Sequence, residues 1–351
     1  MTIYTNIDGS WRNVSSVKTN VDGAWREVTK GDVNIGGSYR TVFSKTAGLN
    51  WATRRNDTTD YFVSVCYSDA LGLFCAISKS PNGIYKVATS PDGITWALGT
   101  PPSTGISWNS VCYGNGYFVT VASGTETSTR KVATSIDGST WTNRTGISNA
   151  SYPMLCYGET PKLFVASADN TDSIMTSPTG VSWTLRTSPA NVRIGCMCWG
   201  DGRFVGLPST YDIYGAYSSN GTSWTALTNL PATNNTIWRS ICYGNGLYVA
   251  VAAGSNINNL MTSSDGVLWT PRTTPVFSGI AGWKTVCYGN GAYIAIGSSS
   301  TTNAAISSTD GINWAGVSGF CSPSSAKTLE SICYGNGIFV AVGKGQILTS
   351  D

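Results

Sequence analysis

The sequence predicts an all-β protein in which a seven-bladed β-propeller follows a small module of β-hairpins. Three observations lead to this prediction. A Cys-aromatic pair occurs seven times, a Ser-x-Asp-Gly-x-x-Trp motif follows six of these pairs, and an unrelated repeat of 14 residues fills the N-terminal segment. The successive Cys-aromatic pairs are separated by 42 to 46 residues, which matches one four-stranded blade each. We therefore assign residues 1–43 to the module and residues 44–351 to the propeller.

The first landmark of each blade is a cysteine in the expected innermost strand. Near-copies such as SVCYGNGYFVTVAS from Ser110 and SICYGNGLYVAVAA from Ser240 show how closely the blades repeat. The Asn-Gly pair that follows predicts a tight turn, because glycine adopts a positive φ without steric cost. The seven landmark cysteines are Cys66, Cys112, Cys156, Cys198, Cys242, Cys287 and Cys333. We expect them to be buried, reduced and structural, because a thiol packs as a small apolar side chain.

The second landmark predicts the turn between the third and fourth strands. Its tryptophans are Trp96, Trp141, Trp183, Trp224, Trp269 and Trp314. Thr179 and Asn220 replace the aspartate in the third and fourth copies, whereas the glycine is present in all six. In the second blade the expected strands are 108–113, 117–122, 131–135 and a fourth that Trp141 opens, each short and ended by a turn signal.

The two ends of the propeller predict how the ring closes. The seventh unit stops at Ser350-Asp351, and the missing Gly-x-x-Trp stands before the first blade as Gly48-Leu49-Asn50-Trp51. An open ring would expose two unpaired strand edges. We therefore expect the strand around Trp51 to pair with residues 346–350 and to complete the last blade.

These motifs resemble two groups of known proteins. The Ser-x-Asp-Gly-x-x-Trp copies are similar to the Asp-box of sialidase-like propellers, although they are one residue shorter than Ser-x-Asp-x-Gly-x-x-Trp. In that family the motif is a structural turn on the outer edge of a blade, away from any active site. Repeats of the form CYGNGxFVAVG followed by SxDGxxW resemble those of bacteriophage tail proteins. That resemblance implies a protein of the virion tail that is folded in the host cytoplasm.

The N-terminal module predicts three hairpins with Asp-Gly or Gly-Gly turns. Its copies begin at Asn6, Asn20 and Asn34. About 43 residues without disulfides or metal rarely fold alone, so the module needs a partner. That partner is the propeller, a sister chain or another virion protein. Tandem copies of this kind resemble attachment modules of phage tail proteins, which implies docking to the virion; the alternative is a decoration packed on the last blade. The docking candidates are Trp11, Arg12, Trp25, Arg26, Tyr39 and Arg40.

Composition excludes several functions. Charged residues make up only 12% of the chain, and the net charge of +3 is spread without runs of Lys or Arg, so we expect no nucleic-acid partner. No segment approaches 18 apolar residues and the N-terminus has no signal-peptide pattern, so we expect neither membrane insertion nor export. There is no histidine, and Cys196-Met197-Cys198 is not a CxxC motif, so no metal and no cofactor are expected.

Few residues of the chain suit catalysis. The only glutamates are Glu27, Glu126, Glu159 and Glu330, and none is expected at a recurrent position of an inner strand. Asp201 and Asp212 are the one carboxylate pair that a blade brings near each other, and hydrolysis of a glycoside needs such a pair. Because aspartates are common in turns, we expect no enzymatic activity; a sialidase-like hydrolase is the alternative.

Variable loops and aromatic side chains mark the expected binding face. The connections between second and third strands, and those between blades, differ in length and sequence, and function often resides on such loops. They include residues 79–85, 99–107, 124–130, 184–192, 209–214, 225–237, 255–259 and 271–282. Trp108, Trp238 and Trp283 stand four residues before a landmark cysteine, as does Tyr152, and Phe62, Ile194 and Leu329 occupy the same place elsewhere.

These aromatic residues have two interpretations. They pack between blades, or they offer stacking platforms for sugar rings, with Arg239 and Lys284 adding hydrogen bonds. Tyr211 and Tyr214 fall in a loop and are expected to be exposed. The favoured hypothesis is a bacteriophage tail protein, at a fibre or baseplate tip, that binds host surface glycan through these residues. The alternatives are a purely structural protein of the baseplate or collar and the hydrolase.

Overall fold

The computed structural model divides the chain into two compact units, residues 1–46 and 47–351. In the first unit the structure describes the backbone of the strands alone. In the second it describes residues 50–57, 59–79, 86–102, 106–122, 132–144, 151–168, 173–189, 192–208, 214–228, 230–231, 237–254, 259–275, 277, 280, 282–298, 303–317, 320 and 328–350. The sequence boundary after residue 43 falls one residue before the end of strand β6 (Ser38–Ser44).

The first unit consists of three separate two-stranded hairpins, as predicted. They are β1 (Ile3–Ile7) with β2 (Ser10–Val14), β3 (Lys18–Val21) with β4 (Ala24–Glu27), and β5 (Lys30–Ile35) with β6. The 14-residue repeat is visible in the pairing register: Asn6 lies opposite Trp11, Asn20 opposite Trp25, and Asn34 opposite Tyr39. An isolated two-stranded hairpin is marginally stable in water, and the partner that the sequence predicts for this unit stays a prediction.

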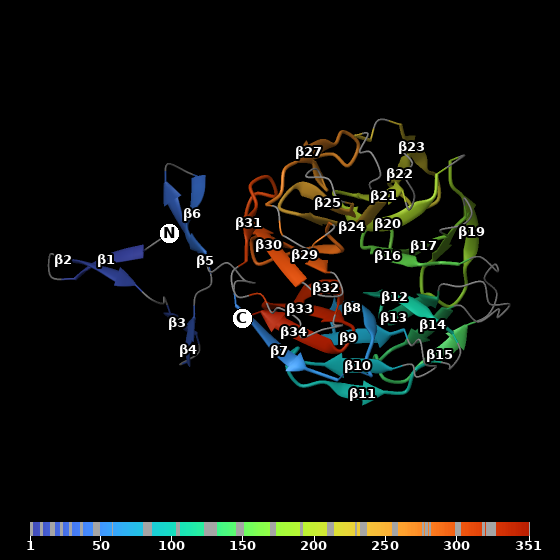
Figure 1. Cartoon of the computed structure of the whole chain (residues 1–351), viewed down its shortest axis with the longest axis horizontal. Coiled ribbons are helices and arrows are strands. Elements are labelled where there is room, and N and C mark those ends of the chain that lie inside the picture. The colour runs from blue at the N-terminus through green and yellow to red at the C-terminus, as the bar shows by residue number, and fades with distance from the viewer. Residues whose placement is uncertain are drawn as a thin grey trace. The chain divides into compact units, whose positions relative to one another are not determined.

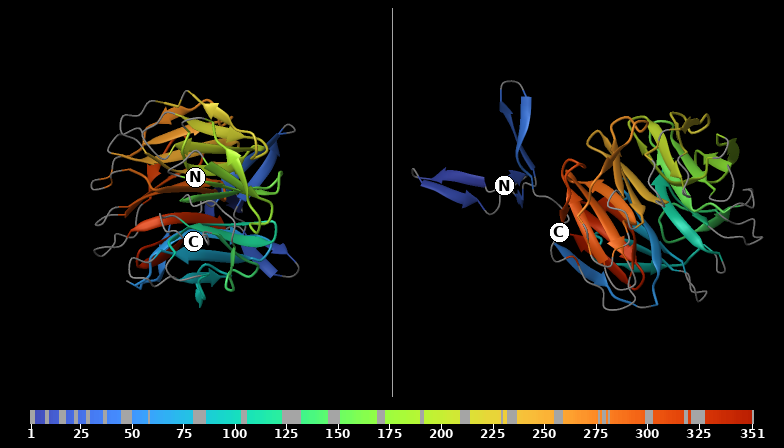
Figure 2. Two further views of the ribbon diagram at one scale, coloured as in Figure 1. Left: turned by 90° about the vertical axis from the view of Figure 1, so that its right-hand side faces the viewer. Right: turned by 45° about the horizontal axis from the view of Figure 1, so that its top comes forward.

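The second unit is a seven-bladed propeller, and each blade is a four-stranded antiparallel sheet (Figures 1 and 2). The innermost strands are β8 (Phe62–Ser68), β12 (Trp108–Gly114), β16 (Met154–Gly158), β20 (Ile194–Gly200), β24 (Ile237–Gly244), β28 (Thr285–Gly289) and β32 (Leu329–Gly335). The second strands are β9 (Leu73–Ser78), β13 (Tyr117–Ala122), β17 (Leu163–Ser167), β21 (Arg203–Pro208), β25 (Leu247–Ala253), β29 (Ala292–Ser298) and β33 (Ile338–Gly343).

The outer half of each blade is shorter. The third strands are β10 (Val87–Ser90), β14 (Val132–Ser135), β18 (Ser173–Ser177), β22 (Gly215–Ser218), β26 (Leu260–Ser263), β30 (Asn303–Ser308) and β34 (Gln346–Ser350). The outermost strands are β11 (Ala97–Gly99), β15 (Thr142–Arg144), β19 (Thr184–Thr187), β23 (Thr225–Leu227), β27 (Thr270–Arg272), β31 (Ala315–Gly316) and β7 (Trp51–Arg55). The described part of the chain contains no helix of the length and apolar character that crossing a membrane requires.

The ring closes as the sequence predicted. Strand β7 is the outermost strand of blade seven and pairs with β34, so that Trp51 lies opposite Ser350. Next to this seam, Asp60 is buried and its carboxylate forms ion pairs with both Arg55 and Lys86. The Asp60 carbonyl also accepts a 2.8 Å hydrogen bond from the Gly345 N–H. Blade seven and blade one are therefore joined by charge and backbone as well as by the shared strand.

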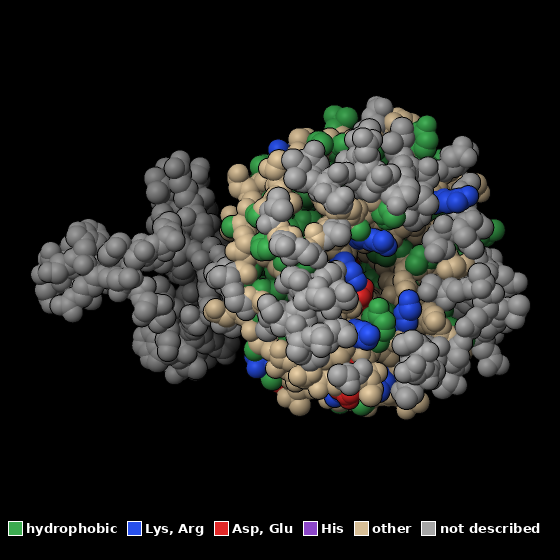
Figure 3. Space-filling view, viewed as in Figure 1, with side chains coloured by type: hydrophobic (Ala, Val, Ile, Leu, Met, Phe, Trp, Pro, Cys, Tyr) green, Lys and Arg blue, Asp and Glu red, His purple; other side chains and the backbone are tan. Residues whose placement is uncertain are grey.

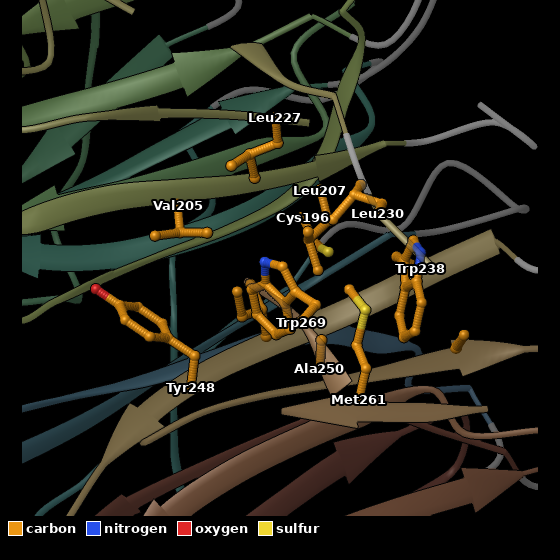
Figure 4. Packing of buried hydrophobic residues seen from close by; sticks show 12 residues of the cluster. Cys196, Val205, Leu207, Leu227, Leu230, Trp238, Tyr248, Ala250, Met261 and Trp269 are labelled. Atoms are coloured by element: carbon orange, nitrogen blue, oxygen red, sulfur yellow. The ribbon is translucent and has the colours of Figure 1, made fainter. Parts of the chain in front are cut away.

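Seven apolar clusters form the core, one at each interface between neighbouring blades. Figure 4 shows the cluster between blades four and five, where Val205 and Leu207 of one blade face Tyr248 and Met261 of the next. Side chains on both faces of every blade are buried in this way. The core is thus a closed ring of interfaces, and each blade depends on its two neighbours for burial.

The Tyr-Gly pair of the repeat has a packing role at these interfaces. The ring of Tyr243 lies directly on the backbone of Gly200 in the preceding blade, and a Cβ added there would approach it to 2.2 Å. The same contact recurs between Gly114 and Tyr157. No side chain fits between the two blades at this level, which is why glycine follows the aromatic residue in all but the first blade. There Ser68 takes its place and is completely buried.

The turn residues act as predicted. Asn115 and Gly116 both have positive φ values, of 45° and 84°, as a tight two-residue turn between twisted strands requires. In the Ser-x-Asp-Gly-x-x-Trp turn of blade two, the Ser135 hydroxyl accepts a 2.8 Å bond from the Gly138 N–H, and the Trp141 Nε1–H donates to the Gly138 carbonyl at 3.0 Å. The motif is therefore a hydrogen-bonded structural turn.

The aspartate of this motif becomes more acidic on folding. Partial burial acts to raise the pKa of Asp137, but bonds from the backbone N–H groups of Thr140 and Ser139, and from the Ser135 hydroxyl, outweigh it and lower that pKa to about 2. Asn220 in blade four makes the same backbone contacts with its neutral amide oxygen, at 2.9 Å each. The hydrogen bonds thus do not require a charge at pH 7.

Removing strand β7 should destabilise the propeller. We expect deletion of residues 1–55 to lower the free energy of unfolding by about 3 kcal/mol or more, the scale of losing one buried tryptophan, since Trp51 packs edge-on against Phe320 at 5.1 Å. Deletion of residues 1–46, which keeps β7, is the matched control and should leave the propeller's denaturation midpoint unchanged. Equal midpoints for both deletions would contradict closure by β7.

Acid should weaken the third-to-fourth-strand turns. A carboxyl whose pKa is lowered by folding stabilises the fold fully above its ordinary pKa of 3.8, and that stabilisation is lost as pH falls toward 2. We expect the melting temperature to drop between pH 4 and pH 2, and to drop less in the triple variant Asp92→Asn, Asp137→Asn, Asp265→Asn. At pH 7 this variant should melt close to the original protein, as the Asn220 turn indicates. Parallel acid curves for the two proteins would show that these turns do not titrate with folding.

Candidate functional site

The two faces of the propeller are built differently. Turns between first and second strands lie on the same face as turns between third and fourth strands. A hydrogen bond between the two kinds of turn shows this: the Asn115 side-chain amide, after the first strand of blade two, donates to the Pro178 carbonyl, after the third strand of blade three, at 3.0 Å. Arg203 reaches the Asp265 carbonyl in the same way at 2.9 Å. We call this the turn face. The opposite face carries the connections between second and third strands and between blades, and we call it the loop face.

A β-bulge distinguishes the loop-face end of the innermost strands. In five blades the pairing with the second strand skips one residue near the start of the innermost strand, directly after a buried residue. Blade six has a bulge at the same place. The Lys284 N–H donates to the Ile296 carbonyl, and Ile296 also lies opposite Thr285, so Lys284 and Thr285 both face Ile296. A bulge leaves its residue unpaired and redirects the side chain, and such bulges are frequent beside functional sites.

The bulge position defines a ring around the propeller axis, which we call the mouth ring. Its members, in blade order, are Val63, Asn109, Pro153, Gly195, Arg239, Lys284 and Glu330. Members of neighbouring blades are within reach of one another: the Asn109 side-chain amide donates to the Pro153 carbonyl at 2.7 Å, and Lys284 pairs with Glu330 at 2.8 Å. Figure 3 shows Lys and Arg side chains and an acidic side chain around the hollow at the centre of the propeller.

The acidic member of the ring is held by several donors. Glu330 Oε1 accepts bonds from Lys284 Nζ at 2.8 Å, from the Thr328 hydroxyl at 2.9 Å and from the Tyr61 hydroxyl at 3.5 Å. Burial raises the pKa of Tyr61, and the adjacent Glu330 carboxylate adds to the rise. At neutral pH this corner of the ring therefore holds one carboxylate whose charge Lys284 compensates, beside a neutral phenol.

The cations of the ring lie in blades five and six. Arg239 is exposed, and among the described residues no side chain forms an ion pair with it. Lys284, one blade farther round, is paired with Glu330. Arg193, two residues before the ring position of blade four, is also exposed and has an interaction of its own. We call the ring positions of Arg239 and Lys284 the cationic side of the ring.

Three predicted ligand-binding residues are buried instead of exposed. Trp108, Trp238 and Trp283 keep only 2–3% of their surface, and each belongs to a different inter-blade cluster. Tyr152 and Phe62 at the equivalent position are also buried. The packing interpretation holds for all of them, and the stacking-platform interpretation is wrong, because no indole face remains for a sugar. These side chains instead support the bulge residue that follows.

The structure describes some of the other predicted site residues and leaves the rest outside the described part of the chain. Tyr214 is 40% exposed beside strand β22 on the loop face, as expected for a loop residue, whereas Tyr211 lies outside the described residues. Arg239 and Lys284 occupy the ring position of adjacent blades, five and six. The docking candidates Trp11, Arg12, Trp25, Arg26, Tyr39 and Arg40 lie on the second strand of each hairpin, and their side chains are outside the described part of the structure.

Sequence reasoning missed Glu330 as a member of the site. No glutamate was expected at a recurrent inner-strand position, yet Glu330 occupies the bulge of β32. The signal was present in the repeat alignment, because the position three residues before the landmark cysteine carries charge in three consecutive blades. Tyr61 and Arg193 gave no such signal, since the residues preceding the strand do not repeat.

The interior of the propeller axis is lined by the landmark thiols. Nine of the ten cysteines are described and all nine are free. Burial raises the pKa of all seven landmark thiols, to about 12 at Cys112 and Cys287, and thiols of neighbouring blades add to the rise at Cys66, Cys198 and Cys333. The thiolate is the reactive form of cysteine, and a raised pKa keeps the thiol protonated, so these side chains are unreactive.

The acidic side chains of the described residues are dispersed. No group of three or more Cys, Asp or Glu side chains among them is arranged to hold a metal ion. Asp201 lies in a turn on the turn face with a φ of 44°, and Asp212 is outside the described residues. Glu330 is engaged with Lys284. What the mouth ring offers is a set of hydrogen-bond donors and charges, which suits recognition of a ligand.

Comparison with solved structures identifies the architecture. The chain is similar to virginiamycin B lyase from Staphylococcus aureus with quinupristin bound, at 10% identity and a TM-score of 0.66, covering 86% of this chain and 99% of that one. It is also similar to YCF48 bound to D1 peptide, at 14% identity and a TM-score of 0.63, covering 86% and 94%. The WD40 β-propeller domain of Doa1 matches at 12% identity and a TM-score of 0.59, covering 86% and 97%.

These identities establish the β-propeller fold and no more. No protein-family model matches the sequence, and a search of curated proteins finds no relative.

The landmark thiols should be unreactive until the protein unfolds. We expect Ellman's reagent at pH 8 to modify them slowly in the native protein, because little thiolate forms when burial raises the pKa. After denaturation without reductant, alkylation and mass spectrometry should find ten free thiols. A count below ten would reveal a disulfide, and rapid labelling of the native protein would show that the axis is open to the reagent.

Proposed function

We propose that this chain is a binding protein that holds its ligand on the loop face, and that it serves a bacteriophage tail by attaching to glycan on the host surface. The observation that carries the proposal is the mouth ring. At one structural position, set out by a bulge, the side chain changes from apolar to amide to cation to carboxylate around the axis. A scaffold that keeps its interior uniform and varies one surface position in this way is suited to recognition.

One of the similar structures supports a binding role, and another is an enzyme. The lyase structure with quinupristin is a catalytically inactive variant in which a histidine is replaced by alanine, and this chain has no histidine. Its activity therefore offers no template here. The YCF48 structure shows a propeller of this fold with a bound peptide. A hydrolase remains the less favoured alternative, because the carboxylates that a glycosidase pairs are not brought together among the described residues.

The particular role in a virion rests on the sequence resemblance to tail proteins and on the N-terminal hairpins. Three hairpins that share no sheet need a partner surface, which a docking module would find on another tail protein or a sister chain. A polar, weakly charged surface with an exposed Tyr214 suits carbohydrate, which presents hydroxyls and apolar ring faces. A purely structural baseplate or collar protein is the second candidate, and the same module supports it.

Host binding and virion assembly should be separable. We expect the double variant Tyr211→Ala, Tyr214→Ala to reduce binding of the purified protein to susceptible host cells by about tenfold, the effect of losing one or two aromatic contacts. Assembly into particles should be unchanged. The matched control is Leu268→Ala, which removes a side chain that is 69% exposed on the turn face and should bind normally.

Deletion of residues 1–46 completes this test. The truncated propeller should still bind cells but fail to join particles. The proposed division of labour is wrong if the deletion abolishes cell binding while the loop variants bind normally. A full-length protein that binds no susceptible host would favour the structural alternative.

A further inference from the structure

We propose that the cationic side of the mouth ring is a binding site for an anionic group, a carboxylate or a phosphate, with Arg239 as its principal ligand. The site lies where blades five and six meet the axis on the loop face, with Lys284 at the neighbouring ring position. The inference deepens the proposed function, on which it rests for the source of the ligand: it names an acidic glycan as the receptor class.

Pairing within the ring singles out Arg239. Lys284 and Glu330 neutralise each other at 2.8 Å, and the Tyr61 and Thr328 hydroxyls complete the coordination of the carboxylate. No carboxylate of the described residues forms an ion pair with Arg239. An exposed guanidinium at the rim of a hollow, with no carboxylate of the described residues paired to it, creates a positive potential that attracts an anion.

The backbone that carries Arg239 is held on both sides. Trp238 before it is 3% exposed and packs in the cluster between blades four and five. Ser240 after it accepts a 3.2 Å bond from the Val286 N–H of blade six. The bulge between these two anchors places Arg239 outside the strand pairing. Because its Cα is fixed, binding an anion costs mainly the ordering of the side chain itself.

The reach of neighbouring ring members supports a shared site. Lys284 and Glu330 occupy the ring position of adjacent blades, and their side chains meet at 2.8 Å. Arg239 and Lys284 are separated by the same single blade step. An anion of two or more oxygens between them can therefore accept a two-pronged contact from the guanidinium and a further bond from the ammonium, which is the geometry that arginine favours with carboxylate and phosphate.

The ring also orients the ligand. Glu330 repels a second anionic group on the blade-seven side and accepts hydrogen bonds from hydroxyls instead. A sugar acid would thus place its carboxylate toward Arg239 and its hydroxyls toward Glu330. Neutral glycan would gain nothing from the cationic side, so the site distinguishes acidic from neutral saccharides.

The test uses the full chain and calorimetric titration at low ionic strength. The probes are trigalacturonic acid for carboxylate, its methyl ester as the neutral counterpart, and glycerol 3-phosphate for phosphate. We expect one of the two anions to bind and the ester not to bind. Arg239→Gln should weaken that binding by about ten- to a hundred-fold, the effect of one lost charge-assisted contact, and 0.5 M salt should weaken it in the original protein.

The matched control is Lys162→Gln, which removes an exposed cation from a turn on the turn face and should leave binding unchanged. Preference for the uronic acid would indicate an acidic polysaccharide, and preference for glycerol phosphate a phosphorylated surface polymer. The proposal is overturned if neither anion binds, if the ester binds as well as the acid, or if the two variants weaken binding equally.

Host-cell binding separates this inference from the proposed function. If Arg239→Gln binds cells normally while the Tyr211 and Tyr214 variant does not, the anion site is wrong and the attachment role stands. If the protein binds the anion through Arg239 but never binds a susceptible host, the site stands and the attachment role is wrong. Circular dichroism of each variant confirms that loss of binding is not loss of folding.

Discussion

The propeller depends on the contact between the innermost strand of each blade and that of the next. At six of the seven interfaces an aromatic ring of the next blade lies on a glycine backbone and leaves no room for a side chain there, as Tyr243 does on Gly200. In blade one the buried Ser68 takes the place of the glycine. The contact sets the spacing of the blades at the axis, and the apolar clusters farther out follow from that spacing. Because each blade buries both its faces against neighbours, one missing interface would expose two apolar surfaces to water.

Closure by β7 follows from this constraint. A ring of blades has no free face only when the last blade meets the first, and a strand shared between the chain ends holds them together. The buried Asp60 carboxylate forms ion pairs with Arg55 and Lys86 and so joins the two blades at the same seam. Its desolvation is compensated by two cations and by backbone bonds to the neighbouring turn, so the seam is specific as well as stable.

A closed and uniform interior leaves the surface free to vary. The landmark thiols along the axis occupy equivalent positions from blade to blade. Cys156 is buried and the other six are half-buried, not fully buried as the sequence predicted. Their raised pKa values make them unreactive, so they contribute packing. Three residues before the thiol on the same strands, a bulge releases one residue from pairing in six of the seven blades. There the side chains differ in every blade, and charge gathers on one side of the ring. The fold thus separates the residues that keep it closed from those available to a ligand.

The innermost strands show which features the sequence predicted and which it did not. The repeat predicted the blade number, the strand order, the Asn115-Gly116 turn and the closure through Trp51, because each follows from local patterns of period two, turn chemistry and chain length. It also predicted that Arg239 and Lys284 lie at the variable-loop face, directly after two of the tryptophans. It did not decide between the two interpretations of Trp108, Trp238 and Trp283, since an indole next to a loop is compatible with both.

Only the tertiary structure decided that the three indoles pack between blades, and only it brought the residues of the mouth ring together. The amino-acid sequence by itself determined that seven similar blades form and that the ring closes, because repetition and hydrophobic period specify local structure directly. Burial of the indoles depends on the neighbouring blade, 40 or more residues away in the chain. The meeting of Lys284 with Glu330 and Tyr61 depends on ring curvature and on a bulge that shifts the register by one residue. Such contacts between distant residues arise from the geometry of closure, which no single repeat contains.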